Sequence, residues 1–203
     1  MSTNHEKTIR ENLQKLYDHL PEDLEKSLPA LRKGETFSFT AFGEECAIEP
    51  ERITFSGEAD YGPRGLLLSL YATYATPETL KLEPFKDFKD FPGGMPYHGA
   101  FHANSERVLV PRVGPIQESR DLILRLFRGV ADAAGPAGDF SLLLYPLPKI
   151  ALCYIFYLPD EDFPPSVTCL FSANAHSFMP LDGLADVAEY SSKKILHILE
   201  RLG

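Results

Sequence analysis

Two histidines four residues apart, in His98-Gly-Ala-Phe-His102, have the side chains and spacing most suited to chemistry. Residues at this spacing share one face of a helix, so two imidazoles could bind one metal ion or ligate a cofactor. The zinc-protease pattern His-Glu-x-x-His needs a glutamate after the first histidine, and Gly99 occupies that position. The pair therefore predicts a metal or cofactor ligand face without protease chemistry. The alternative is a pair of surface or helix-capping histidines.

Any third metal ligand must come from a distant part of the chain. His176 lies between the end of an expected strand and the start of an expected helix, and its alternative role is to brace that loop through a backbone carbonyl. Asp160, Glu161 and Asp162 could offer oxygen ligands to calcium or magnesium. Acidic residues beside paired prolines also form hydrogen-bonded turns. The metal hypothesis therefore names His98, His102 and His176 as ligands, with an acidic residue of 160–162 as a base.

A glycine pair precedes the histidines, in Pro92-Gly-Gly-Met-Pro96. This segment must turn tightly, because both glycines allow positive φ and the close approach of another group. Binding groups concentrate in such loops, so one cleft is expected to gather the candidate ligand-binding residues. These candidates are Gly93, Gly94, Tyr97, His98, Phe101, His102, Asp160 and His176. Phosphate-loop, dinucleotide and serine-nucleophile motifs are absent from the sequence, so it identifies neither a reaction nor a cofactor.

The elements that must position these residues centre on one apolar run. Ile150 to Leu158 contains only apolar, aromatic or small residues, which predicts a strand buried on both faces. The proline-rich turn 159–165 follows, and 167–171 returns as the next strand, while 140–145 is expected to pair on the other side. Apolar residues at helical spacing then predict a closing helix after Pro180.

The first half of the chain shows patterns of both helices and strands. Helices are expected at 8–20, from Pro21 to a stop at Gly34, at 63–74 with Asp60 as a possible cap, and at 117–134 with Val130 facing inward. Alternating residues predict strands at 36–41, 46–49 and 52–56. The segregated order of elements favours a single-domain α+β fold, with a mainly antiparallel sheet covered by helices, an N-terminal helical pair and a C-terminal helix.

The N-terminal helical segment, residues 1–33, is distinguished from the α+β domain at 34–203, within one globular unit. Its apolar stripe includes Leu24, Leu28 and Leu31. The helical pair is expected to pack on its own domain, and the alternative is a dimerising coiled coil. The sequence does not fix the oligomeric state.

Composition narrows the choice of partners and location. The 203 residues include 29 acidic and 20 basic side chains, giving a formal net charge of −9, which disfavours nucleic acid and anionic membrane surfaces. The three cysteines are far apart, and we expect them to be core thiols in a reducing cytosol. The polar N-terminus and the absence of a long apolar run make a cytoplasmic protein the expectation.

Three stretches resemble motifs of the prokaryotic domain of unknown function 3786 family: Phe91-Pro-Gly-Gly-Met-Pro-Tyr97, Asp160-Glu-Asp-Phe-Pro164 and Leu170-Phe-Ser-Ala-Asn-Ala-His-Ser-Phe-Met-Pro180. The resemblance extends from about Gly34 onward. It implies a context of anaerobic one-carbon or redox metabolism, with an iron–sulfur or corrinoid protein as partner. It brings no established activity. Ser172 departs from the acidic residue common in the family, and the chain carries no cysteine-rich module.

Three functional hypotheses follow. The first is a binding or accessory module that holds a small molecule, a metal or a redox-protein partner. The second is a metal-dependent enzyme that uses His98, His102 and His176. The third is a structural subunit that dimerises through its N-terminal helices.

Overall fold

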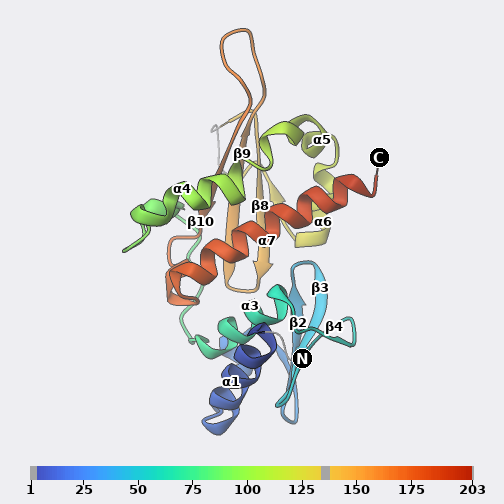
Figure 1. Cartoon of the computed structure of the whole chain (residues 1–203), viewed down its shortest axis with the longest axis vertical. Coiled ribbons are helices and arrows are strands. Elements are labelled where there is room, and N and C mark those ends of the chain that lie inside the picture. Colours follow the sequence, from blue (N-terminus) through green and yellow to red (C-terminus); the bar gives the residue numbers. More distant parts are fainter. Residues whose placement is uncertain (1–3, 134–137, 203) are drawn as a thin grey trace.

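Antiparallel strands divide between two sheets that lie end to end in the computed structural model, which describes residues 4–133 and 138–202 (Figure 1). The first sheet follows chain order: β1 (Leu31–Lys33), β2 (Thr36–Ala41), β3 (Glu44–Ile48), β4 (Ile53–Phe55) and β5 (Glu58–Ala59). The second has the order β6 (Lys86–Asp87), β10 (Ser166–Phe171), β9 (Ile150–Tyr157), β8 (Phe140–Leu147) and β7 (Val130–Ala131).

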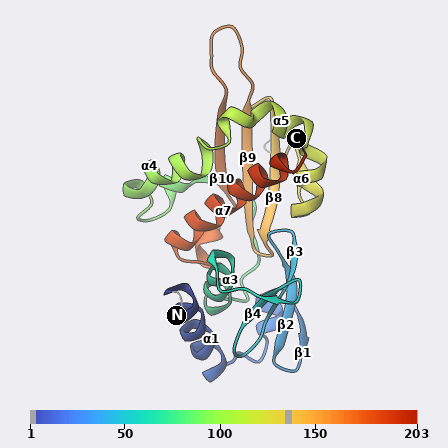
Figure 2. The same ribbon diagram turned by 45° about the vertical axis from the view of Figure 1, so that its right-hand side comes forward.

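Helices cover both sheets and join them. They are α1 (Asn4–Asp18), α2 (Leu24–Ser27), α3 (Pro63–Thr73), α4 (His98–Phe101), α5 (Val113–Glu118), α6 (Arg120–Phe127) and α7 (Leu181–Glu200). A π-helical turn, His102–Glu106, continues α4, and short 3₁₀ turns lie at Phe88–Asp90, Met95–Tyr97, Val110–Arg112 and Ala175–Ser177. Figure 2 shows α7 running across the second sheet, with α4 on one side and α6 on the other.

The first sheet is a meander with α1 and α3 packed beside it. Ile9, Leu13 and Leu16 of α1 are buried, as the helical spacing predicts. Asn12 of the same helix donates from Nδ2 to Ser69 Oγ on α3 at 3.0 Å. The N-terminal helix therefore packs on its own domain, which removes the apolar face that dimerisation through this helix requires. The boundary after residue 33 stays a prediction.

Asp60 caps α3 as the sequence indicates. Its Oδ1 atom accepts hydrogen bonds from the backbone N–H groups of Gly62 at 2.8 Å and Gly65 at 3.2 Å. These donors lie at the start of the helix, where backbone N–H groups have no partner inside the helix itself. Pro63 opens the helix because its missing N–H costs nothing there.

The prediction of the second helix is wrong in its length. A helix from Pro21 to Gly34 was expected, but α2 is confined to Leu24–Ser27. Pro29 cannot donate a helical hydrogen bond, so the chain leaves the helix before it. Leu31, expected on the apolar stripe, instead begins the edge strand β1 and is 75% exposed.

The second sheet is buried on both faces: successive side chains of its central strands point to opposite faces, and each face packs against apolar residues. Leu152, Tyr154 and Phe156 of β9 face the main core beneath α7, and Cys153 and Ile155 belong to a smaller cluster on the other face. Seven of the eight residues of β9 are buried. The uninterrupted apolar run therefore predicted this strand correctly, together with its antiparallel neighbours β8 and β10.

The prediction of one helix at 117–134 is also wrong in its second half. It divides into α5 and α6, and Arg128 ends α6 with a left-handed φ of 52°. Val130, expected to face inward, is 53% exposed and pairs with Leu143 as part of the edge strand β7. Gly129 permits this change, since a Cβ there would lie 2.4 Å from the Leu143 carbonyl oxygen. Ala134 lies outside the described residues.

The two sheets share one core. The backbone N–H of Phe42, after β2, donates to the Pro146 carbonyl in β8 at 2.7 Å. Lys149, in the β8–β9 turn, donates from Nζ to the carbonyls of Thr76 at 2.6 Å and Glu78 at 2.8 Å. The main core cluster runs from Ile9 to Leu199 and includes buried residues of both sheets. The fold is therefore a single-domain α+β fold, as the sequence predicts.

Candidate functional site

His98 and His102 lie side by side, as their spacing predicts. Their ring centroids are 6.4 Å apart, with 30° between the ring planes. His98 is in α4, and His102 begins the π-helical turn that follows it. Such turns are rare and occur frequently at functional sites.

Each histidine faces a carboxylate that the sequence analysis did not identify. His98 Nδ1 lies 3.5 Å from Asp87 Oδ1 in the edge strand β6. His102 Nδ1 contacts Glu106 Oε2, one turn further along its own helix. Glu106 is almost fully buried, and its Oε1 atom accepts a hydrogen bond from the Cys169 backbone N–H at 2.8 Å. Asp87 reaches His98 only through the fold, whereas Glu106 stands four residues after His102, a helical spacing that is visible in the sequence.

The two glycines before this helix have different roles. Gly93 has a positive φ of 84°, which glycine adopts without strain. Gly94 has an ordinary helical φ, but a Cβ there would lie only 2.1 Å from the Phe88 carbonyl oxygen. Gly93 therefore provides the turn, and Gly94 allows the backbone to pass close to the Phe88 carbonyl oxygen.

The aromatic candidates beside the histidines divide between core and surface. Phe101 is buried and stacks on Phe88, with ring centroids 4.5 Å apart. Tyr97 is 64% exposed. Both line a hollow of about 450 Å³ between the α4 segment and the first turns of α7.

His176 and Asp160 lie beyond opposite ends of β10. His176 lies in a 3₁₀ turn after β10, where its ring is 5.3 Å from that of Phe91. Asp160 lies beyond the opposite end of β10, in the connection that projects from the molecule (Figure 1). Its Oδ1 atom accepts hydrogen bonds from the N–H groups of Asp162 and Phe163, so it forms the turn offered as the alternative to an oxygen ligand.

Within residues 4–133 and 138–202, no group of three or more His, Cys, Asp or Glu side chains could hold a metal ion. The ligand set of His98, His102 and His176 is therefore not assembled there. The ligand-binding roles of Gly93, Gly94, Tyr97, Phe101, Asp160 and His176 stay predictions.

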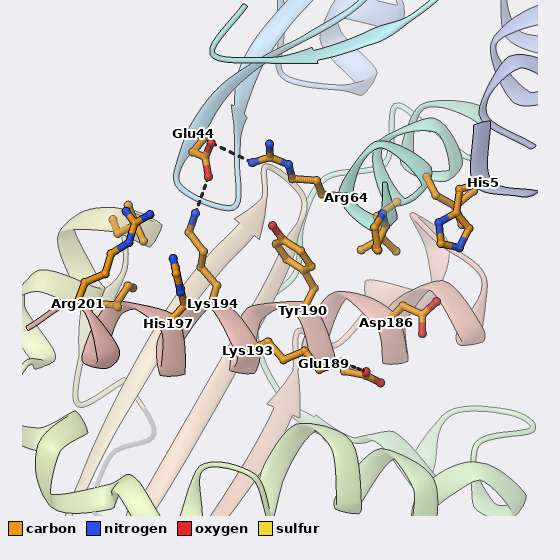
Figure 3. A pocket seen from close by; sticks show the side chains of 15 residues that line it. His5, Glu44, Arg64, Asp186, Glu189, Tyr190, Lys193, Lys194, His197 and Arg201 are labelled. Carbon is orange, nitrogen blue, oxygen red and sulfur yellow. Dashed lines mark hydrogen bonds and ion pairs between the residues drawn. The ribbon is translucent and has the colours of Figure 1, made fainter. Parts of the chain in front are cut away.

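A larger cleft, which the sequence analysis missed, lies between α7, α3 and the β2–β3 turn (Figure 3). It has a volume of about 960 Å³. Its apolar surface comes from Leu66, Leu67, Leu126 and Ile198, and its polar side chains come mainly from α7. The largest concave surface with a few converging polar groups is the first place to expect a ligand.

Glu44 connects the elements that form the cleft. Its two carboxylate oxygens accept hydrogen bonds from Lys194 on α7 and from Arg64 on α3, the latter at 3.0 Å (Figure 3). Arg64 also bonds the Asp60 carboxylate and lies over the Phe55 ring at 4.2 Å. Burial alone would raise the pKa of Glu44, but Lys194 and Arg64 outweigh it and lower that pKa. The carboxylate is therefore held ionised between two cations.

The cleft changes charge along α7. Lys194, His197 and Arg201 lie toward the C-terminal end of the helix, and Asp186 and Glu189 lie toward the N-terminal end (Figure 3). Partial desolvation, and after it the carboxylates of Glu189 and Asp182, raise the pKa of Asp186. Burial likewise raises the pKa of Tyr190, which lies between the two ends. Perturbed ionisable groups in a concave site are a common sign of function.

One signal for this cleft was present in the sequence. Tyr190, Lys194, His197 and Arg201 recur at spacings of four, three and four, which places them on one face of a helix. Their partners Glu44 and Arg64 lie more than 100 residues earlier and reach them only through the tertiary fold.

Comparison with known proteins identifies the family without adding an activity. No curated protein and no solved structure gave a significant match. In the described residues, no helix combines the length and apolar character needed to cross a membrane. A family model described as "Domain of unknown function (DUF3786)" matches residues 18–194, which include the histidine pair and most of the cleft. The chain therefore belongs to the domain of unknown function 3786 family.

Proposed function

We propose that this protein is a binding module whose α7 cleft holds a small molecule with an anionic group and an apolar body. The observation that carries the proposal is the stripe of Lys194, His197 and Arg201 beside the apolar wall of this cleft. Carboxylate and phosphate groups pair well with such side chains. The apolar body would cover Leu66, Leu67 and Leu126.

The charge of the cleft supports an anion despite the acidic composition of the chain. Four lysines and arginines line it, against the three carboxylates of Glu44, Asp186 and Glu189, whereas the whole chain carries −9. Glu44 is already paired with two of the cations, and Lys193 pairs with Glu189 at 2.6 Å. Among the described residues, Arg201 forms no ion pair, although it lines the cleft. Arg201 is therefore the cation best placed to receive a ligand.

A fluorescence titration with anilinonaphthalene sulfonate, an anion with an apolar body, tests this proposal. We expect saturable binding to the wild-type protein and clearly weaker binding to the double variant His197→Gln, Arg201→Gln. Lys33→Gln, which removes an exposed positive charge from β1, serves as the control and should bind as the wild type does. Equal affinity in the wild type and the double variant, with all three proteins folded by circular dichroism, would refute the anion site.

The finer parts of the first hypothesis rest on the family resemblance. From it we propose an iron–sulfur or corrinoid protein as a partner, and from the composition a cytoplasmic location. The alternative of a dimerising subunit has no such support, because Ile9, Leu13, Leu24 and Leu28 are buried within the chain.

A further inference from the structure

We propose that His98 and His102 form an open two-histidine site for a divalent transition-metal ion, separate from the α7 cleft. Glu106 would hold the His102 imidazole, and Asp87 would place a negative charge beside Nδ1 of His98. The proposal differs from the three-histidine site expected from the sequence, because His176 takes no part. It rests on the arrangement of these four side chains.

The contacts of the two rings select the nitrogen that can bind a metal. In both histidines the atom that faces a carboxylate is Nδ1: Asp87 lies at 3.5 Å from His98, and Glu106 contacts His102 directly. A carboxylate beside Nδ1 favours a proton on that nitrogen and leaves a lone pair on Nε2. Metal-ligating histidines commonly have this carboxylate–imidazole pairing, which fixes the ring and raises the basicity of the ligand.

The exposure of the rings indicates that the opposite edges face outward. The side chain of His98 is 32% exposed, yet its Nδ1 atom is buried and has no hydrogen-bond partner among the described residues, with Asp87 at 3.5 Å as its nearest carboxylate. The side chain of His102 is 47% exposed, while the Glu106 side chain on its Nδ1 atom is only 7% exposed. The accessible parts of both rings therefore lie away from Nδ1.

The supporting carboxylates are themselves anchored. Asp87 Oδ1 accepts a hydrogen bond from the Lys89 backbone N–H at 3.1 Å, and Oδ2 pairs with Lys89 Nζ at 3.0 Å. Glu106 is fixed to β10 through the Cys169 N–H. Glu106 therefore fixes the His102 ring, whereas His98 Nδ1 has no hydrogen-bond partner among the described residues. The ring centroids lie 6.4 Å apart, so the His98 ring must move toward His102 for both Nε2 atoms to lie about 2 Å from one ion.

The ligand type determines the class of metal. Neutral imidazole nitrogens suit Zn²⁺, Ni²⁺ and Cu²⁺, whereas Ca²⁺ and Mg²⁺ prefer oxygen ligands. In the described part of the chain, Asp87 pairs with the Lys89 ammonium group and Glu106 pairs with no lysine or arginine, and this balance favours a cation nearby. With two protein ligands, the remaining coordination positions would be open to water or to a ligand supplied by another molecule.

Calorimetric titration of untagged, metal-stripped full-length protein with NiCl₂, and separately with ZnCl₂, tests the proposal. We expect one binding event in the wild type and its loss in both His98→Gln and His102→Gln. Asp87→Asn keeps both ligands but removes a supporting charge, and should weaken binding by about 10–100-fold. A weakened but retained metal affinity would show that Asp87 acts on the His98 imidazole. A purely structural role would leave the metal affinity unchanged.

His19→Gln is the matched control. His19 is exposed in the turn after α1, pairs with no second imidazole among the described residues, and lies outside the α7 cleft. This variant should bind metal as the wild type does. The inference is overturned if either His98→Gln or His102→Gln retains wild-type affinity, or if the wild type shows no binding event. Thermal unfolding of each variant confirms that loss of binding is not loss of fold.

Discussion

At the scale of single residues, several charged side chains of the two candidate sites bind partners that belong to other elements of the fold. Glu44 binds Arg64 and Lys194, and His98 faces Asp87. The sequence predicted that His98 and His102 share a helix face, because that depends only on local geometry. It did not predict Asp87 or the cleft, because those contacts exist only once the sheets and α7 are assembled. Glu106 stands four residues after His102, so its helical spacing could have indicated that contact.

Glu44→Gln should lower the free energy of unfolding by about 1–2 kcal/mol at neutral pH, since it removes the charge shared by two partly exposed cations. The folded pKa of Glu44 is lowered from 4.5, so the charge stabilises the protein above that value, and its contribution is lost as pH falls through the lowered folded pKa. Urea unfolding at neutral and acidic pH measures the difference. Glu45→Gln, an exposed neighbour, should show no comparable loss at neutral pH; equal losses would contradict the role of Glu44.

Gly94→Ala should destabilise the fold by about 1–3 kcal/mol, because the new methyl group overlaps the Phe88 carbonyl oxygen. Gly99→Ala, five residues later in α4, is the matched control. A Cβ at Gly99 meets nothing within 4 Å, and alanine favours the helix by up to about 1 kcal/mol. Thermal unfolding of the two variants should therefore shift in opposite directions. A shift of the same size and sign in both would contradict the account of the glycine pair.

At the scale of elements, the sequence predicted best where burial depends on one segment alone. The strand β9 is apolar on both faces, so its pattern was sufficient. The helix expected at 117–134 failed because Gly129 brings the chain against β8 and turns Val130 into an edge strand, a tertiary contact that helical periodicity does not encode. Helical periodicity did not predict the π-helical turn either.

A buried polar network attaches that π-helical turn to α7. Ser192 Oγ donates to the Ser105 carbonyl at 2.6 Å, and the Tyr154 hydroxyl lies 3.0 Å from Ser192 Oγ. Ser192→Ala should leave the Ser105 carbonyl without this donor and lower the free energy of unfolding by about 1–3 kcal/mol.

Ser191→Ala is the control for this prediction. Ser191 is as deeply buried, but its hydroxyl donates only to the Val187 carbonyl of its own helix. Its substitution should change stability by no more than about 0.5 kcal/mol, because alanine regains helix propensity. Chemical denaturation gives both values. Equal losses in the two variants would show that the link to the π-helical turn is not special.

At the scale of the whole molecule, two sheets share one core, with Lys149 and Phe42 at their junction. The sequence predicted the α+β class and the antiparallel pairing from the order of its elements. It did not predict the division into two sheets, because both halves are apolar and only the assembled fold shows which strands pair.

This shared core predicts cooperative unfolding. Urea transitions followed by tyrosine fluorescence, in a chain with nine tyrosines and no tryptophan, and by far-ultraviolet circular dichroism should coincide. Lys149→Met should move both transitions together to lower urea, since two carbonyls lose a charged donor, at about 1–3 kcal/mol. Two separate transitions would instead indicate that the first sheet folds independently of the second.

The central claim, that the α7 cleft binds an anion with an apolar body, is tested most directly by mapping amide chemical shifts by NMR during titration with anilinonaphthalene sulfonate. We predict that the largest changes fall on residues 190–201, 42–45 and 63–67, the three segments around the cleft. The changes at 190–201 should disappear in the double variant His197→Gln, Arg201→Gln. Shifts confined to other surfaces, or no saturable shifts, would contradict the claim.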